Sequence, residues 1–291
     1  MKPLLSQVYN PLDKGCAWLR LAAKNAGFSR RFVSPILPLR MNSLQKAGRL
    51  GFRLLKIAAT NPRRLSHVCG IAFSATDDVM DKSCDLLQLP YIDINDLLPV
   101  AGDPWEIKMA MFPKTHASIS LLEFTALILL LKRANAKRIF EFGTFKGISI
   151  TQLALNLPLD SEIYTLDLPD EQLKTQFSTD PEDTVIAVEP GKGSLVPAGL
   201  RGRIRFLQSD SAKFDESPFE GKMDFVFVDG AHNFDYVKND SAKGWRMLRR
   251  GGIIAWHDCR HQDPGVVRCL LQSPFKPSRI SGTTVAFATK P

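Results

Sequence analysis

The sequence predicts an α/β protein with a doubly wound, mostly parallel sheet of seven strands, preceded by a mostly helical N-terminal region. Two observations predict this class. From residue 118 onward, short runs rich in Ile, Val and Phe alternate with longer segments of helical periodicity, as in parallel sheets with helices on both faces. Near the C-terminus, two short apolar runs flank Ser281 and Gly282, which predicts an antiparallel hairpin at the edge of the sheet.

Each element follows from its local pattern. Apolar residues three or four apart indicate helices, and compact Ile-, Val- or Phe-rich runs indicate strands. In chain order we expect helix 118–133, strand 137–142, helix 147–155, strands 162–166, 203–207 and 223–228, helix 234–249, strand 253–256 and helix 266–271. Residues 169–201 combine acids, Pro and Gly with weak periodicity, so we expect a loop or lid insertion there.

The composition is that of a globular protein, with 44% hydrophobic and 23% charged residues among 291. It excludes a disordered, collagen-like or multi-span membrane protein. The five cysteines include no CxxC pair, which argues against a disulfide framework or a structural zinc site. A reducing compartment is favoured, so we expect a cytoplasmic protein.

Positive charge is concentrated at the N-terminus. The first 66 residues hold thirteen Lys and Arg and a single acid, whereas the remaining 225 hold 25 basic and 29 acidic groups. Residues 44–58 predict an amphipathic helix, with the basic side chains of one face being Lys46, Arg49, Arg53 and Lys56. The prolines at 99 and 104 mark a boundary, which divides the chain into a basic N-terminal region, 1–104, and a main domain, 105–291.

Several roles stay open for the basic region. Its helix could touch an anionic membrane surface and make the protein peripheral at the membrane, or pack on the main domain with its charges in water. An Arg-rich, acid-poor start is also typical of organellar transit peptides. Nucleic acid is a weaker expectation, because aromatic residues do not alternate with the basic ones as stacking platforms would.

An acid follows each of the five predicted parallel strands. These acids are Glu141, Asp167, Asp210, Asp229 and Asp258. Ligands of open α/β sheets bind at the carboxyl ends of the strands. We therefore expect the five carboxylates to gather in one ligand-binding crevice.

The loop after the first strand, E-F-G-T-F-K-G over residues 141–147, has the glycine spacing of a cofactor loop. It departs from the dinucleotide pattern G-x-G-x-x-G at Phe145, and Glu141 would repel a diphosphate. A cationic cofactor without phosphate, S-adenosylmethionine (SAM), fits better. We expect Glu141, Gly143, Thr144 and Gly147 beside it. Asp167 would accept the ribose hydroxyls, and Asp210 would accept the adenine amino group.

Five stretches together resemble the class I SAM-dependent methyltransferases, which have a Rossmann-like sheet. They are residues 138–147, 164–169, 225–232 (F-V-F-V-D-G-A-H), 238–240 (K-N-D) and 248–258 (L-R-R-G-G-I-I-A-W-H-D). The similarity is greatest to a bacterial subfamily with V-D-G-A-H and G-G-x-I-x-x-H-D motifs, which includes macrolide-sugar O-methyltransferases. It covers about two thirds of the chain, from residue 105 to the end.

The resemblance implies O-methylation of a hydroxyl on a small-molecule or glycan-type acceptor. His232 would be the general base, and Asp229, beside the cofactor, would bind a divalent cation such as Mg²⁺ together with Asp258. His257 and Cys259 stand where the relatives place a further acid or amide. Asp229 could instead cap a turn, and His232 could bond the backbone. An NAD-dependent oxidoreductase, and a SAM-binding module that docks on an anionic surface without catalysis, are the alternative functions.

Overall fold

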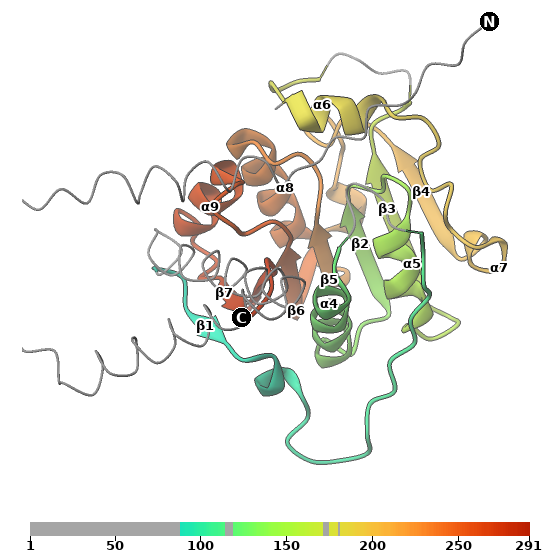
Figure 1. Ribbon diagram of the computed structural model, residues 1–291, viewed down its shortest axis with the longest axis vertical. Helices are drawn as coiled ribbons and strands as arrows, with labels where there is room; N and C mark the ends of the chain where they lie inside the picture. Colours follow the sequence, from blue (N-terminus) through green and yellow to red (C-terminus); the bar gives the residue numbers. More distant parts are fainter. Residues whose placement is uncertain (1–87, 114–118, 171–174, 180) are drawn as a thin grey trace, which may run out of the picture. The chain divides into compact units, whose positions relative to one another are not determined.

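The computed structural model describes residues 88–113, 119–170, 175–179 and 181–291 (Figure 1). The predicted helix over 44–58 and the whole basic segment lie outside the described residues. So does the start of the predicted helix at 118. Within the described ranges, no helix is long and apolar enough to cross a membrane.

A mixed sheet of eight strands forms the centre of the described part of the chain. The strand order is β1-β7-β8-β6-β5-β2-β3-β4. The bounds are β1 Tyr91–Ile92, β2 Arg138–Phe142, β3 Glu162–Asp167, β4 Ile204–Gln208, β5 Met223–Val228, β6 Leu248–Trp256, β7 Ser278–Ile280 and β8 Ala286–Thr289. Strands β2 to β6 are parallel, and β8 runs antiparallel to both β6 and β7.

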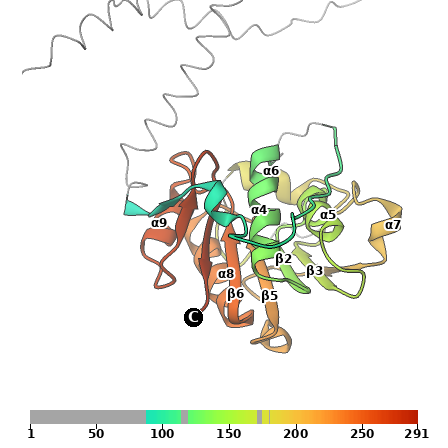
Figure 2. The same ribbon diagram turned by 90° about the horizontal axis from the view of Figure 1, so that it is seen from below.

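This sheet has one strand more than the predicted seven. The additional strand is β1, from the predicted N-terminal region, in which Tyr91 and Ile92 pair in parallel with Arg279 and Ile280. In Figure 2, β1 lies beside the red C-terminal strands. Two residues between Pro90 and Asp93 are too few to show a strand pattern. They form a strand because they pair with β7, which is distant in the sequence.

Helices cover both faces of the sheet, as predicted. They are α4 (Leu121–Arg133) and α5 (Ile148–Leu155) on one face, and α8 (Phe234–Met247) and α9 (Pro264–Leu271) on the other. Two short 3-10 helices, Ile94–Leu97 and Ser217–Phe219, lie in connecting segments.

Alternate residues of each central strand enter two separate hydrophobic cores. In β5, Phe225 and Phe227 pack with the helices α4 and α5, whereas Val226 and Val228 pack with α8 and α9. Because both faces are buried, the strand is apolar at nearly every position. This explains why the central strands could be predicted as continuous Ile-, Val- and Phe-rich runs.

Three predicted elements are corrected. The helix over 234–249 ends at Met247, because buried Leu248 already pairs with Met223 as the first residue of β6. The hairpin is antiparallel, but β8 lies inside the sheet between β6 and β7. The segment 169–201 is not only loop: it contains α6 (Pro181–Val188) and α7 (Ala198–Arg201).

Candidate active site

The carboxyl ends of the parallel strands surround a cavity of about 260 Å³. Seven of the predicted site residues line it: Gly143, Thr144, Asp167, Asp210, Asp229, His232 and Asp258. Glu141 and Gly147 do not. The prediction that the strand-end acids meet in one crevice therefore agrees with the structure for four of the five.

The loop from Gly143 to Gly147 is shaped by backbone conformations that favour glycine. Gly143 has φ +95°, and a Cβ at this position would lie 2.0 Å from the carbonyl oxygen of Asp229. Gly147 has φ +82° at the N-terminus of α5, and a Cβ there would meet Val196 at 2.4 Å. Both glycines are thus required by the packing of this turn.

Asp167 holds this loop from the end of β3. Its Oδ2 accepts hydrogen bonds from the backbone N–H groups of Thr144 at 3.0 Å and Phe145 at 2.7 Å. Its Oδ1 accepts from the N–H of Leu168 at 2.7 Å and lies 3.4 Å from Lys192 Nζ. The carboxylate therefore connects the cofactor loop with a lysine that the sequence did not single out.

Asp210 is buried at the end of β4 and has three donors. The N–H groups of Gln176 and Ala212 donate at 2.7 and 2.9 Å, and the Tyr236 hydroxyl donates at 2.9 Å. Tyr236 lines the cavity too. Tyr236 lies in the predicted helix 234–249, where its spacing is explained by packing, so the sequence pattern does not indicate its place at the site.

Glu141 lies behind the cavity wall. It has no exposed surface, and it accepts a hydrogen bond at 2.6 Å from the Thr165 hydroxyl. Burial raises its pKa to about 8, despite hydrogen bonds from Thr165 and Ser149 that favour the ionised form. Its carboxyl group is therefore largely protonated at neutral pH.

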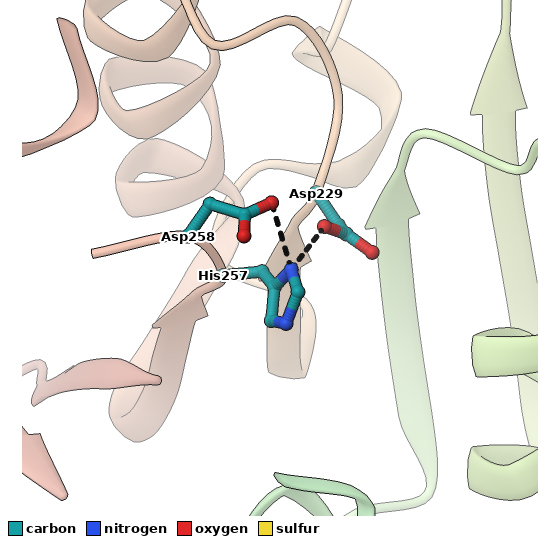
Figure 3. A group of neighbouring side chains, drawn as sticks. All are labelled: Asp229, His257 and Asp258. Carbon is teal, nitrogen blue, oxygen red and sulfur yellow. Dashed lines mark hydrogen bonds and ion pairs between the residues drawn. The ribbon is translucent and has the colours of Figure 1, made fainter. Parts of the chain in front are cut away.

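Asp229, His257 and Asp258 form a compact cluster at the ends of β5 and β6 (Figure 3). His257 Nδ1 lies 2.9 Å from Asp258 Oδ2 and 3.1 Å from Asp229 Oδ1. Its Nε2 lies 3.7 Å from Glu123 Oε2. A nitrogen lone pair facing two carboxylates would be repelled, so Nδ1 either carries a proton or binds a cation.

The cluster has the donor chemistry of a divalent metal site. One ligand atom from each of the three residues lies within 4.8 Å of the others. Two carboxylates with one imidazole suit Mn²⁺, Fe²⁺ or Zn²⁺ better than Mg²⁺, which prefers oxygen ligands. Arg260 Nη2 lies 3.1 Å from Asp258 Oδ1, so a metal would compete there with a permanent charge of the chain.

Glu123 supports this cluster from the first turn of α4. It accepts hydrogen bonds from the backbone of Ser120 at 2.9 Å, and from the N–H and hydroxyl of Thr284 at 2.9 and 2.8 Å. Burial alone would raise the pKa of Glu123, but the nearby His257 and the hydrogen bonds from Ser120 and Thr284 outweigh it and hold this pKa well below its usual range. The spacing of Ser120 and Glu123 is that of a capping box, a sequence signal that could have identified this helix start.

His232 is held between two carboxylates. Its Nδ1 lies 2.5 Å from Asp183 Oδ1 and its Nε2 lies 2.9 Å from Asp258 Oδ2. Burial alone would lower the pKa of His232, but these two partners outweigh it and raise the pKa to about 11. In this arrangement the imidazole is protonated at neutral pH. It can act as a base only after Asp183 or Asp258 has moved away from the ring nitrogen that it contacts.

The strands and helices form a Rossmann-like α/β domain with a cavity at the carboxyl ends of the parallel strands, where ligands bind in open α/β sheets. A family model described as "Methyltransferase domain" matches residues 140–259. This range includes the cofactor loop and all five strand-end acids. The match supports a methyltransferase.

Named relatives agree with this match. A flavonoid 3',5'-methyltransferase of Vitis vinifera is 33% identical over 133 residues, covering 44% of this chain and 49% of that protein. A caffeoyl-CoA O-methyltransferase of Populus kitakamiensis is 32% identical over 146 residues, covering 48% and 54%. The chain thus spans about half the length of the curated relatives it matches. These relatives are plant enzymes, and the narrower bacterial subfamily stays a prediction.

Solved structures include similar chains as well. An O-methyltransferase from Bacillus cereus in complex with SAH (S-adenosylhomocysteine) is 17% identical, with a TM-score of 0.43, and the match covers 60% of this chain and 84% of that one.

Proposed function

We propose that this chain is a SAM-dependent O-methyltransferase that acts on a hydroxyl group of a small molecule. The observation that carries the proposal is one cavity lined by Gly143, Asp167 and Asp210 at the cofactor loop and strand ends, and by His232. The O-methyltransferases among the relatives support oxygen as the methyl acceptor.

The charge of the cavity favours a cationic cofactor. Seven aspartates line it, against two lysines, one arginine and two histidines; these are Asp167, Asp183, Asp210, Asp229, Asp240, Asp258, Asp263, Lys146, Lys192, Arg260, His232 and His257. Even with both imidazoles protonated, the carboxyl groups outnumber the basic side chains by seven to five. The sulfonium and ammonium groups of SAM would be attracted there, whereas the diphosphate of a dinucleotide would be repelled. This argument favours the methyltransferase over an NAD-dependent oxidoreductase.

The site residues suggest how the cofactor would be held. Asp167 would accept the ribose hydroxyls at the end of β3, and Asp210 would accept the adenine amino group with its carboxylate oriented by Tyr236. Gly143 would line the cofactor site while its turn stays against the backbone of Asp229, because no side chain separates the two. Glu141 would not contact the cofactor directly, because its neutral carboxyl group is buried beneath the residues that line the cavity.

His232 is the proposed general base, through Nε2. The acceptor hydroxyl would replace Asp258 as the partner of this nitrogen, which leaves Asp183 alone on Nδ1. As the acceptor oxygen bonds to the methyl carbon, its proton passes to Nε2, and the sulfur–carbon bond of SAM breaks with its electron pair left on sulfur. Positioning and deprotonation are the contributions this chain would make.

Asp229, His257 and Asp258 would hold a divalent cation. Such a cation, when bound, lowers the pKa of a coordinated hydroxyl. His257 and Arg260 already neutralise part of the carboxylate charge in the same place. These two basic side chains therefore place positive charge where the divalent cation would bind.

The acceptor is proposed to have an apolar body. The apolar side chains of Ile119, Phe124 and Ile186 line the cavity, and they would pack against a hydrocarbon or aromatic ring. The relatives' names include a flavonoid and a caffeoyl thioester, which favours an aromatic hydroxyl over the hydroxyl of a sugar.

The test is a methyl-transfer assay with radiolabelled SAM on caffeoyl-CoA, a flavonoid with adjacent hydroxyls, and a free hexose. We expect transfer to at least one aromatic acceptor. His232→Ala should abolish transfer and leave the affinity for SAH within about threefold, because the substitution removes the base and no cofactor contact. SAH binding without transfer to any acceptor, in wild type and variant alike, would favour the non-catalytic SAM-binding module.

A further inference from the structure

We propose that Asp183, on α6, is a positioning residue for His232, so that the base is aligned only while α6 covers the cavity. The inference rests on the proposed function, since it assigns a role in methyl transfer. It concerns a residue within the segment whose sequence predicted only a loop or lid.

Both carboxylate oxygens of Asp183 bind one residue. Oδ1 lies 2.5 Å from His232 Nδ1, and Oδ2 accepts the backbone N–H of His232 at 2.7 Å. Asp183 is only 7% exposed. A carboxylate that contacts both the ring and the backbone of the same histidine fixes the ring plane relative to the chain.

The helix that carries Asp183 forms part of the cavity wall. Ile186 and Ala187 line the cavity, and α6 lies at the carboxyl ends of the parallel strands (Figure 1). Lys192 Nζ donates to the carbonyls of Ile186 at 3.4 Å and Ala187 at 3.0 Å, and lies 3.4 Å from Asp167 Oδ1.

Two contacts therefore fasten α6 over the cavity. Asp183 reaches the proposed base after β5, and Lys192 reaches the proposed cofactor-binding Asp167 after β3. The lysine also lies at the C-terminal end of α6, where the helix dipole favours positive charge. While both contacts are made, α6 stays over the cavity and His232 keeps its orientation.

The effect of Asp183 on His232 depends on which ring nitrogen the carboxylate contacts. A carboxylate on Nδ1 keeps the proton of the neutral imidazole on that nitrogen, so that the lone pair of Nε2 faces the cavity. It also stabilises the imidazolium that forms when Nε2 takes a proton. The acceptor hydroxyl displaces Asp258 from Nε2 and leaves Asp183 in place, so Asp183 acts throughout the reaction.

The experiment compares Asp183→Asn and Asp183→Ala with the wild type. Glu189→Gln is the matched control: its carboxylate lies just after α6 and pairs with Lys146, away from His232. Three measurements are made on the full chain: SAH affinity by calorimetry, the ring ¹⁵N signals of His232, and kcat and KM with caffeoyl-CoA or the flavonoid. A His232→Gln spectrum identifies the ring signals among the five histidines.

We expect both Asp183 variants to bind SAH within about threefold of the wild type, which shows that they are folded. Their kcat should fall on the order of 100-fold with little change in KM. The His232 ring signals should shift toward those of an imidazole without a carboxylate on Nδ1. Glu189→Gln should match the wild type in all three measurements.

Unchanged kcat and unchanged ring signals in Asp183→Ala would overturn the proposal, whatever the acceptor. If the wild type transfers no methyl group at all, the proposed function fails. In that case the ring signals still decide whether Asp183 holds His232.

Discussion

The carbonyl oxygen of Asp229 occupies the space where a side chain on Gly143 would begin. The ideal Cβ position of Gly143 is 2.0 Å from this oxygen, and the backbone φ of +95° disfavours any L side chain. In addition, the N–H of Asp229 donates to the carbonyl of Phe142 at 2.9 Å. The cofactor loop and the end of β5 are thus fitted directly against each other.

Gly143→Ala should therefore destabilise the protein strongly. A contact with backbone cannot be relieved by a rotamer change, so β2 and β5 would have to separate locally. We expect the free energy of unfolding in urea to fall by about 3 kcal/mol or more, with loss of SAH binding.

Gly221→Ala is the matched control for Gly143→Ala. Gly221 also has positive φ, at +66°, but a Cβ there meets nothing within 4 Å. Only the backbone strain remains, so we expect a loss of about 1 kcal/mol. Equal losses at the two glycines would contradict the steric argument.

Asp167→Asn tests the cofactor end of the cavity. The amide keeps one acceptor oxygen but loses the charge that faces Lys192, and it cannot serve all the donors now bound by the carboxylate. SAH affinity should fall about tenfold or more. Asp170→Asn, three residues along the chain, is the control and should bind SAH like the wild type. An equal loss of SAH affinity in both variants would contradict the proposal that Asp167 binds the ribose.

Glu141 should make stability depend on pH. Its pKa is about 8 in the folded protein and 4.5 as the ordinary value, so between these values the folded state binds more protons than the unfolded state. This contribution to stability is fully present below pH 4.5 and is lost as the pH rises toward 8. Glu141→Gln, neutral throughout, removes the dependence.

The corresponding measurement is urea unfolding of wild type and Glu141→Gln at pH 5, 6, 7 and 8. The variant should gain on the wild type by up to about 1.4 kcal/mol for each pH unit within this window. A constant difference between the two proteins would show that the Glu141 carboxyl is ionised in the folded state.

Metal titration tests the cluster of Asp229, His257 and Asp258. Because an imidazole is one of the three donors, we expect Mn²⁺ to bind more tightly than Mg²⁺ in calorimetry after EDTA treatment. His257→Ala should weaken Mn²⁺ binding. Arg260→Ala should strengthen it, since the guanidinium competes for Asp258; weaker binding in this variant would contradict that competition.

Much of the site could be predicted because it depends on local pattern. Parallel strands place their carboxyl ends together, so an acid after each strand brought Asp167, Asp210, Asp229 and Asp258 to one cavity. Glu141 differs because strand alternation places it one residue before the end of β2, where it faces inward.

The partners that come from distant segments could not be predicted. Asp183 reaches His232 across 49 residues of sequence, and Val185 to Val188 form an unbroken apolar run, which conceals the helical period of α6. Glu123 and Tyr236 lie in helices whose periodicity is explained by packing alone. Their contacts depend on how the helices settle on the sheet, which no local spacing encodes.

The most direct test of the account is calorimetric titration of the purified protein with SAH, once with Mn²⁺ or Mg²⁺ and once with EDTA, alongside a titration with NAD⁺. The proposed cofactor contacts come from Asp167, Asp210 and the loop at Gly143, none of which needs a metal. We therefore predict micromolar SAH binding under all conditions and no binding of NAD⁺. NAD⁺ binding without SAH binding would contradict the proposed methyltransferase function and favour an NAD-dependent oxidoreductase instead.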